Sequence, residues 1–213
     1  MSIPIAQPSL GVEENDAVLA VLASGMIAQG PETSAFEEEF AAYCGVSHAV
    51  ATNNGTAALH AALLAAGIGP GDEVIVPAFT FFATASAVSM CGAIPVFADV
   101  DPETATIDPA AIIGNITPET KAIIAVHLYG QPCDVAAVRR ICDTNDLIFI
   151  EDAAQAHGAT YREGKTGSLG DLACFSFYAT KNMTTGEGGM VTTASDEYDA
   201  RLRRIINHGQ SAK

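Results

Sequence analysis

The unbroken apolar run at residues 122–126 restricts the possible folds more than any other stretch of the chain. A strand without a polar side is typical of a parallel sheet that helices cover on both faces. Shorter apolar runs recur along the sequence, and the segments between them have the spacing of amphipathic helices. This alternation predicts an α/β protein with three layers, α/β/α, around a mostly parallel sheet of seven strands.

The expected elements can be placed by residue number. Strands are expected at residues 48–52, 73–76, 94–98, 122–126 and 147–150, near residue 172 and near residue 190. Helices are expected at residues 13–23, 34–43, 57–66, 80–91, 108–114, 134–144 and 196–207. Ligands of such sheets gather at the carboxyl ends of the strands, so polar residues there are the candidates for a site.

Composition excludes several classes of protein. Apolar residues make up 49% of the 213 residues, which is enough for a sizeable core. The net charge of −15, with ten scattered basic residues, argues against binding of nucleic acid or of anionic membranes. Five dispersed cysteines form no Cys-x-x-Cys pair and no zinc-like pattern with the histidines, and no apolar run approaches the ~20 residues of a membrane helix. We therefore expect a cytoplasmic protein without a metal site.

Lys181 follows an expected strand whose apolar residues alternate at Ala173, Phe175 and Phe177. It lies among aromatic and small residues, where burial disfavours the ammonium and favours a neutral, nucleophilic amine. Such a lysine suits covalent chemistry with a carbonyl group. The alternative is a lysine that extends from a strand end into solvent.

A second candidate is the turn around Gly55, between an expected strand and an expected helix. Gly55 allows the backbone to approach a ligand, and the N–H groups of Thr56, Ala57 and Ala58 lie at the helix N-terminus. Together with the Thr56 hydroxyl they would form an anion site suited to phosphate. An ordinary helix cap without a ligand is the alternative.

Asp152 ends an apolar strand, where an ionised carboxylate is costly unless it is paired. A ligand cation or a protonated ring nitrogen would pair with it, whereas capping of a following helix is the structural alternative. Gln155 could hydrogen-bond the same ligand. An aromatic residue of the segment 77–82 could stack on a flat ligand, although aromatics at such a junction more often belong to the core.

These features add up to a phosphate cradle, a carboxylate for a pyridinium, an aromatic for a ring face and a lysine for an aldehyde. Pyridoxal 5′-phosphate (PLP) requires all four. Each signal has a structural alternative by itself, so their joint position at strand ends supports PLP more strongly than any one of them.

Longer motifs point to a family. They lie at residues 30–31, 54–59, 77–81, 126–131, 151–158, 175–181, 186–189 and 207–209. In these motifs the chain resembles the DegT/StrS-type sugar aminotransferases, which belong to the fold type I (aspartate aminotransferase-like) PLP enzymes. The resemblance runs almost end to end.

The resemblance implies a role for each candidate around the cofactor ring. Lys181 would bind the cofactor covalently and then transfer a proton between substrate and cofactor. Asp152 would keep the pyridine nitrogen protonated. Gln155 would contact the phenolic oxygen side, and Phe81 would stack on the ring face.

The resemblance also implies the phosphate site and the reaction. Thr56 and Ala57 of the Gly55 turn would bind the phosphate together with the Ser176 hydroxyl. The family moves an amino group, usually from glutamate, onto a keto sugar linked to a nucleotide, and its members are homodimers.

Family members continue into a smaller C-terminal domain. Residues 1–213 are therefore expected to be the PLP-binding large domain with an N-terminal helical segment, and the small domain is expected to be absent. Two other functions remain open at this point. A PLP-dependent sugar dehydratase of the same family would carry histidine at the lysine position, so Lys181 argues against it. A non-catalytic PLP-binding remnant is the second.

Overall fold

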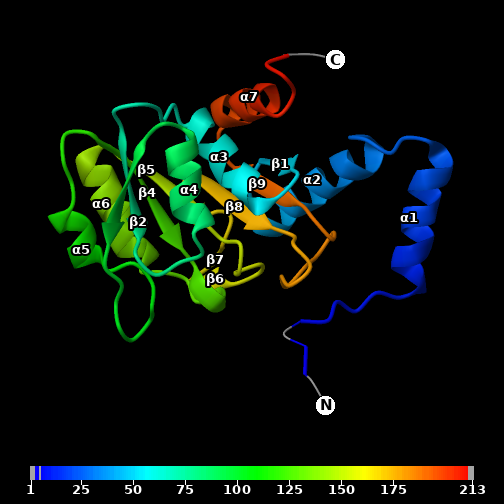
Figure 1. The fold of residues 1–213 in the computed structure, drawn as a ribbon, viewed down its shortest axis with the longest axis horizontal. Helices are drawn as coiled ribbons and strands as arrows, with labels where there is room; N and C mark the ends of the chain where they lie inside the picture. The colour runs from blue at the N-terminus through cyan, green and yellow to red at the C-terminus, as the bar shows by residue number, and fades with distance from the viewer. Residues whose placement is uncertain (1–2, 5, 211–213) are drawn as a thin grey trace.

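A computed structural model describes residues 3–4 and 6–210, and its centre is a seven-stranded sheet (Figure 1). The strands are β1 (His48–Thr52), β2 (Glu73–Pro77), β3 (Ile94–Ala98), β4 (Thr120–Val126), β5 (Ile148–Asp152), β8 (Leu172–Ser176) and β9 (Gly189–Thr193). They lie in the order β1-β9-β8-β5-β4-β2-β3. Strand β9 runs antiparallel to both of its neighbours, and all other pairs are parallel. The mostly parallel sheet predicted from the sequence is confirmed.

Helices cover both faces of this sheet (Figure 1). They are α1 (Val12–Ser24), α2 (Pro31–Cys44), α3 (Gly55–Ala65), α4 (Ala83–Met90), α5 (Pro109–Gly114), α6 (Val135–Asn145) and α7 (Asp196–Ile205), with a short 3₁₀ turn, η1, at Leu128–Gly130. Helices α3, α4 and α7 pack on one face, and α2, α5 and α6 pack on the other. The three-layer α/β/α architecture is therefore also confirmed.

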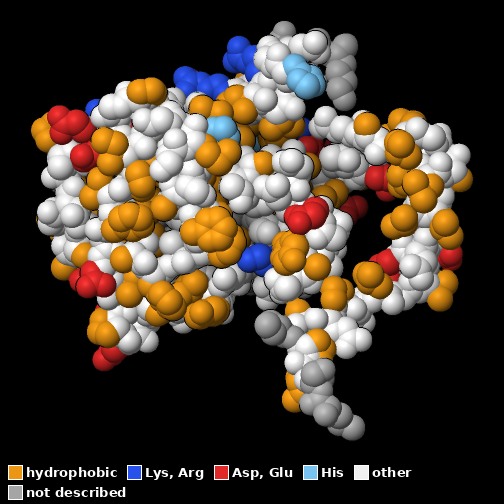
Figure 2. Space-filling model, in the orientation of Figure 1, with side chains coloured by type: hydrophobic (Ala, Val, Ile, Leu, Met, Phe, Trp, Pro, Cys, Tyr) orange, Lys and Arg blue, Asp and Glu red, His pale blue; other side chains and the backbone are white. Residues whose placement is uncertain are grey.

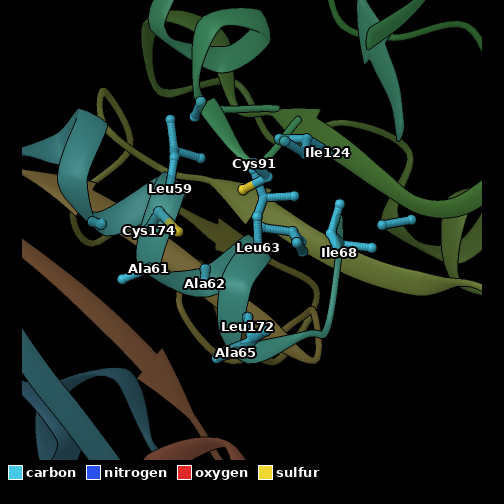
Figure 3. Close-up of a cluster of buried hydrophobic side chains, with 14 of the residues drawn as sticks. Leu59, Ala61, Ala62, Leu63, Ala65, Ile68, Cys91, Ile124, Leu172 and Cys174 are labelled. Carbon is cyan, nitrogen blue, oxygen red and sulfur yellow. The ribbon is translucent and has the colours of Figure 1, made fainter. Parts of the chain in front are cut away.

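Strand β4 contains the unbroken apolar run at residues 122–126, and its burial on both faces of the sheet explains that run. Ala122 and Ile124 belong to the cluster under α3 and α4, whereas Ile123 and Ala125 belong to the cluster under α5 and α6. Figure 3 shows the first cluster, to which Ile124 of β4 and Leu63 of α3 both belong. Both faces of the strand are dry, so a polar residue at any of these positions would lose hydration without compensation.

Two local expectations were wrong. Helix α4 begins at Ala83 and not at residue 80, because the segment before it forms a turn in which the Thr84 N–H donates to the Phe81 carbonyl (3.1 Å). Residues 160–165, which had no predicted strand, form a small antiparallel hairpin of β6 (Thr160–Tyr161) and β7 (Gly164–Lys165). Strands of two residues carry too few side chains for a periodic signal.

Helix α1 stands apart from the sheet (Figure 1), and none of its residues is buried. Its apolar side chains Val18, Leu19 and Leu22 are all more than half exposed. Figure 2 shows hydrophobic side chains gathered along this helix. The predicted helix is therefore present, but the described chain leaves these three apolar side chains largely exposed. None of the described helices combines the length and hydrophobicity that crossing a bilayer requires.

A buried carboxylate ties the end of β5 to a neighbouring loop. Both Glu151 and His127 are fully buried, and the Glu151 carboxylate accepts hydrogen bonds from His127 Nε2 (2.9 Å) and from the N–H groups of Gly167 (3.1 Å), Leu169 and Gly170 (both 2.8 Å). The Cys133 N–H donates to His127 Nδ1 (3.2 Å), so the proton of a neutral ring is on Nε2. Each polar group named here therefore has a hydrogen-bond partner, as a buried charge requires.

Replacing Glu151 by alanine should therefore destabilise the fold strongly. We expect the free energy of unfolding to fall by about 3 kcal/mol or more, because three backbone donors and the imidazole lose their buried acceptor. Urea unfolding followed by circular dichroism measures the change. The exposed Glu163 provides the control, since Glu163→Ala should change stability by less than about 0.5 kcal/mol. Equal effects of the two substitutions would contradict the role given to Glu151.

Candidate functional site

A cavity of about 520 Å³ opens at the carboxyl edge of the sheet. Segments that are far apart in the sequence meet there, namely the ends of β1, β2, β4, β5 and β8 with the residues that follow them. Of the residues predicted from the sequence, the cavity is lined by Gly55, Thr56, Phe81, Asp152, Gln155, Ser176 and Lys181. Ala57 does not line it. The parallel strands explain the convergence, because they direct their carboxyl ends to one edge.

Lys181 lies in the loop between β8 and β9, in a turn where its N–H donates to the Tyr178 carbonyl (2.9 Å). The side chain is half-buried at the cavity wall. Burial lowers the pKa of the Lys181 amine below its usual range, and the negative charge of Asp152 partly opposes this shift. A lysine that merely extends into solvent would not experience such burial. The amine is thus shifted toward its neutral, nucleophilic form.

Asp152 is the last residue of β5 and only 6% exposed. Its Oδ2 accepts a hydrogen bond from the Thr84 hydroxyl (2.8 Å), and Oδ1 accepts one from the Ala154 N–H (3.2 Å). Burial raises the pKa of the Asp152 carboxyl, whereas the Thr84 bond, the Ala154 bond and the positive charge of Lys181 lower it. The residues after Asp152 form a turn and not a helix, so capping of a helix does not explain this carboxylate.

The N-terminus of α3 differs from the expectation in one respect. Asn54 caps the helix, because its Oδ1 accepts from the Ala57 N–H (2.8 Å) and its carbonyl accepts from the Ala58 N–H (3.0 Å). Within the described chain, the N–H groups of Gly55 and Thr56 have no such partner. The donors available to an anion are therefore those of Gly55 and Thr56, and not those of Ala57 and Ala58.

Gly55 is required for a packing reason that the sequence did not show. A Cβ atom at this position would lie 2.7 Å from the Cβ of Ser176, which is too close for two carbon atoms. The glycine allows the start of α3 to approach the end of β8. It thereby brings the Thr56 backbone and the Ser176 hydroxyl to the same wall of the cavity.

The remaining candidates contribute an amide and a ring. Gln155 Oε1 accepts from the Tyr129 N–H (2.8 Å), so the amide nitrogen of Gln155 is the end left for another partner. Phe81 is 58% exposed and lies against Phe82, with ring centroids 4.3 Å apart. The alternative that this aromatic belongs to the core is therefore wrong.

Sequence reasoning missed two hydroxyl groups at the site. Thr80 lines the cavity, and its hydroxyl lies 2.9 Å from that of the fully buried Thr84, which in turn bonds Asp152. A pair of threonines four residues apart after the end of β2 was the available signal. It had no meaning before the fold placed it against β5.

Comparisons with known proteins identify the relatives of this chain. A profile of the DegT/DnrJ/EryC1/StrS aminotransferase family matches residues 8–213. GDP-perosamine synthase from Caulobacter vibrioides is 52% identical over 97% of this chain, and dTDP-3-amino-3,4,6-trideoxy-alpha-D-glucose transaminase from Streptomyces venezuelae is 46% identical over 100%. The chain covers 56% of each of these two relatives, so it spans about half of their length.

A solved structure supports the same relationship. The PLP form of the putative sugar aminotransferase Spr1654 from Streptococcus pneumoniae superimposes with a TM-score of 0.95 at 33% sequence identity, over 99% of this chain and 59% of that one. The family model, the relatives and the fold thus coincide with the resemblance seen in the motifs. The chain belongs to the DegT/DnrJ/EryC1/StrS aminotransferase family.

Proposed function

We propose that this chain is the PLP-binding large domain of an aminotransferase that acts on nucleotide-linked keto sugars. One observation carries the proposal: the cavity holds an amine whose pKa burial lowers and a buried carboxyl whose pKa burial raises, Lys181 and Asp152. A buried carboxylate needs a cationic partner, and a buried neutral amine suits a carbonyl. These two residues and the donors beside them fit PLP. When bound, PLP supplies an aldehyde that accepts an amino group and a protonated ring that withdraws electrons.

Lys181 and Asp152 have complementary roles in this proposal. The neutral amine of Lys181 would hold the aldehyde carbon covalently and later carry a proton to and from the substrate carbon. Asp152 would accept a hydrogen bond from the ring nitrogen and hold a proton there, which also compensates the burial of its own charge. The positions of both residues on one cavity support these roles.

The phosphate would be held at the start of α3. The N–H groups of Gly55 and Thr56, the Thr56 hydroxyl and the Ser176 hydroxyl supply the donors at a helix N-terminus. Ala57, expected to donate its own N–H, would act mainly through the cap that Asn54 provides. Ala57 does not line the cavity, so its contribution to the site would be indirect.

Gln155 and Phe81 would orient the ring. The free amide nitrogen of Gln155 would donate to the phenolic oxygen, while the Tyr129 N–H holds the other end of the side chain. The exposed ring of Phe81 would cover one face of the cofactor. An open aromatic side chain at the cavity wall is available for such a contact without disturbing the core.

The family and the relatives support the proposed substrate class. The two curated relatives are named for GDP- and dTDP-linked amino sugars, which supports a nucleotide-linked keto sugar as acceptor. We propose glutamate as the amino donor and a cytoplasmic homodimer as the working form. Lys181 in the cavity favours amino transfer over the dehydratase alternative, and a remnant without catalysis is tested by the outcomes below.

Lys181→Ala should abolish covalent capture of PLP while leaving the fold intact. The protein is mixed with PLP, reduced with borohydride and analysed by peptide mass spectrometry. We expect a phosphopyridoxyl group on Lys181 in the wild type and none in the variant, because no other described lysine lines the cavity. The exposed Lys121 is the matched control, and Lys121→Ala should retain the adduct. An adduct that persists in Lys181→Ala would disprove the assignment.

Asp152→Asn keeps the shape of the side chain but removes its charge. Covalent capture of PLP should remain, whereas the rate at which glutamate converts the bound cofactor to its amine form should fall by about 10- to 100-fold. Stopped-flow absorbance measures this rate. Asp146→Asn is the control, because asparagine suits the left-handed backbone of this exposed residue (φ 55°). An unchanged rate in Asp152→Asn would show that the carboxylate does not act on the ring.

The rate of PLP capture should depend on pH in a specific direction. Only the neutral amine of Lys181 reacts, so capture falls as pH decreases through its lowered pKa. The midpoint of this pH profile should therefore lie at a lower pH than that of a solvent-exposed lysine, whose pKa is about 10.4. Asp152→Asn removes the charge that raises the Lys181 pKa, so its profile should shift further toward low pH. A shift toward high pH would contradict the coupling between the two groups.

A further inference from the structure

The Thr84 hydroxyl lies within hydrogen-bonding distance of three oxygen atoms behind the cavity. Its Oγ1 lies 2.8 Å from Asp152 Oδ2, 2.9 Å from the Thr80 hydroxyl and 3.1 Å from the Phe81 carbonyl. Thr84 is fully buried in the first turn of α4, so water does not compete for these contacts. Among the described side chains, it is the one that hydrogen-bonds the Asp152 carboxylate.

A hydroxyl group has one proton and can donate only once. An ionised Asp152 only accepts, so the short bond between the two residues requires Thr84 to be the donor. The Phe81 carbonyl then receives no proton from Thr84, because a bond to a charged acceptor is the stronger one. The Thr80 hydroxyl is left to donate to Thr84 Oγ1. Thr80 therefore donates a hydrogen bond to Thr84, and Thr84 donates one to Asp152.

If Asp152 were protonated, the hydrogen bond between Asp152 and Thr84 would reverse its direction. The carboxyl would donate to Thr84 Oγ1, and Thr84 would donate to the Phe81 carbonyl 3.1 Å away. The threonine thus has a different hydrogen-bond arrangement for each state of the acid. The arrangement with the shorter, charge-assisted bond belongs to the ionised state.

The position of Thr84 also determines where Asp152 points. One carboxylate oxygen is held toward α4 by Thr84, and the other is held by the Ala154 N–H, while the His127 N–H fixes the backbone carbonyl of Asp152 (3.0 Å). Thr80 lines the cavity, but Thr84 does not. Thr84 therefore acts on Asp152 without contacting a ligand.

We propose that Thr84, with its hydroxyl oriented by Thr80, is a positioning residue that keeps Asp152 ionised and directed at the ring nitrogen of the cofactor. This inference deepens the proposed function and rests on it for the identity of the cofactor. Its effect on Asp152, however, exists in the protein without any ligand. The two can therefore be tested separately.

The first measurement uses the full chain without cofactor. Aspartate carboxyl carbons are labelled with ¹³C, the Asp152 signal is identified by its loss in Asp152→Asn, and its titration is followed by NMR. The charged or titratable groups around it are Lys181 on the β8–β9 loop, His127 after β4, Cys174 on β8 and Glu151 on β5; α4 contributes none.

Thr84→Val preserves size but removes the donor to the ionised form, so the titration midpoint of Asp152 should rise by about one pH unit. Thr84→Ser restores the hydroxyl and should return the midpoint to the wild-type value. Thr106→Val is the matched control, because Thr106 is also buried and its hydroxyl also bonds a threonine hydroxyl, that of Thr104 (2.9 Å). This control should leave the midpoint unchanged.

The second measurement uses the protein loaded with PLP. Thr84→Val should retain the borohydride-stable adduct but slow the glutamate half-reaction about tenfold, with no change in the glutamate concentration at half-maximal rate. Thr84→Ser should recover most of the rate. A threonine with a purely structural role would give the same rate in all three proteins.

The outcomes distinguish the two proposals. An unchanged Asp152 midpoint in Thr84→Val, or a Thr84→Ser protein as altered as Thr84→Val, overturns the role of Thr84. If Thr84→Val does not fold, Thr80→Val replaces it as the test. Thr80→Val should also raise the Asp152 midpoint, by a smaller amount. An unchanged midpoint in Thr80→Val would overturn the proposed role of the Thr80–Thr84 pair. A shifted midpoint without any PLP adduct in the wild type supports the role of Thr84 and overturns the proposed cofactor.

Discussion

Two adjacent carboxylates at the end of β5 differ in their hydrogen bonds and in their access to the cavity, and the cavity depends on this difference. Glu151 is fully enclosed and accepts four hydrogen bonds from the imidazole of His127 and three backbone N–H groups. Asp152 accepts two, one of them at 3.2 Å, and lines the cavity. Because successive residues of a strand point to opposite faces, one position closes the structure and the next remains available to a ligand.

The antiparallel strand β9 places the lysine. Strand β8 ends at Ser176, and the chain must turn back to pair β9 beside it, so residues 177–188 form a loop over the carboxyl edge of the sheet. Lys181 lies in this loop. A parallel continuation would have carried the chain to the opposite edge through a helix, away from Asp152. The single reversed strand therefore brings an amine and an acid to one cavity.

Several parts of the site were predictable because they depend on local order along the chain. Asp152 follows an apolar strand, Lys181 follows another, and Gly55 lies between a strand and a helix, so the rule that ligands gather at strand ends selects all three. Other features depend on contacts that the sequence does not show. Asn54 occupies the N–H of Ala57, which moves the free donors to Gly55 and Thr56. Thr84 becomes significant only because α4 lies against the end of β5.

The sequence by itself determined the class of fold, the succession of strands and helices and the family, since hydrophobic periodicity and motifs are properties of neighbouring residues. The tertiary structure decided which hydrogen-bond donors remain free, which acid is sealed and which is open, and why Gly55 cannot carry a side chain. These facts depend on distances of about 3 Å between segments that are many residues apart, such as the 2.7 Å that a Cβ at Gly55 would leave to Ser176. No local pattern encodes such distances, because they arise only when the sheet has assembled.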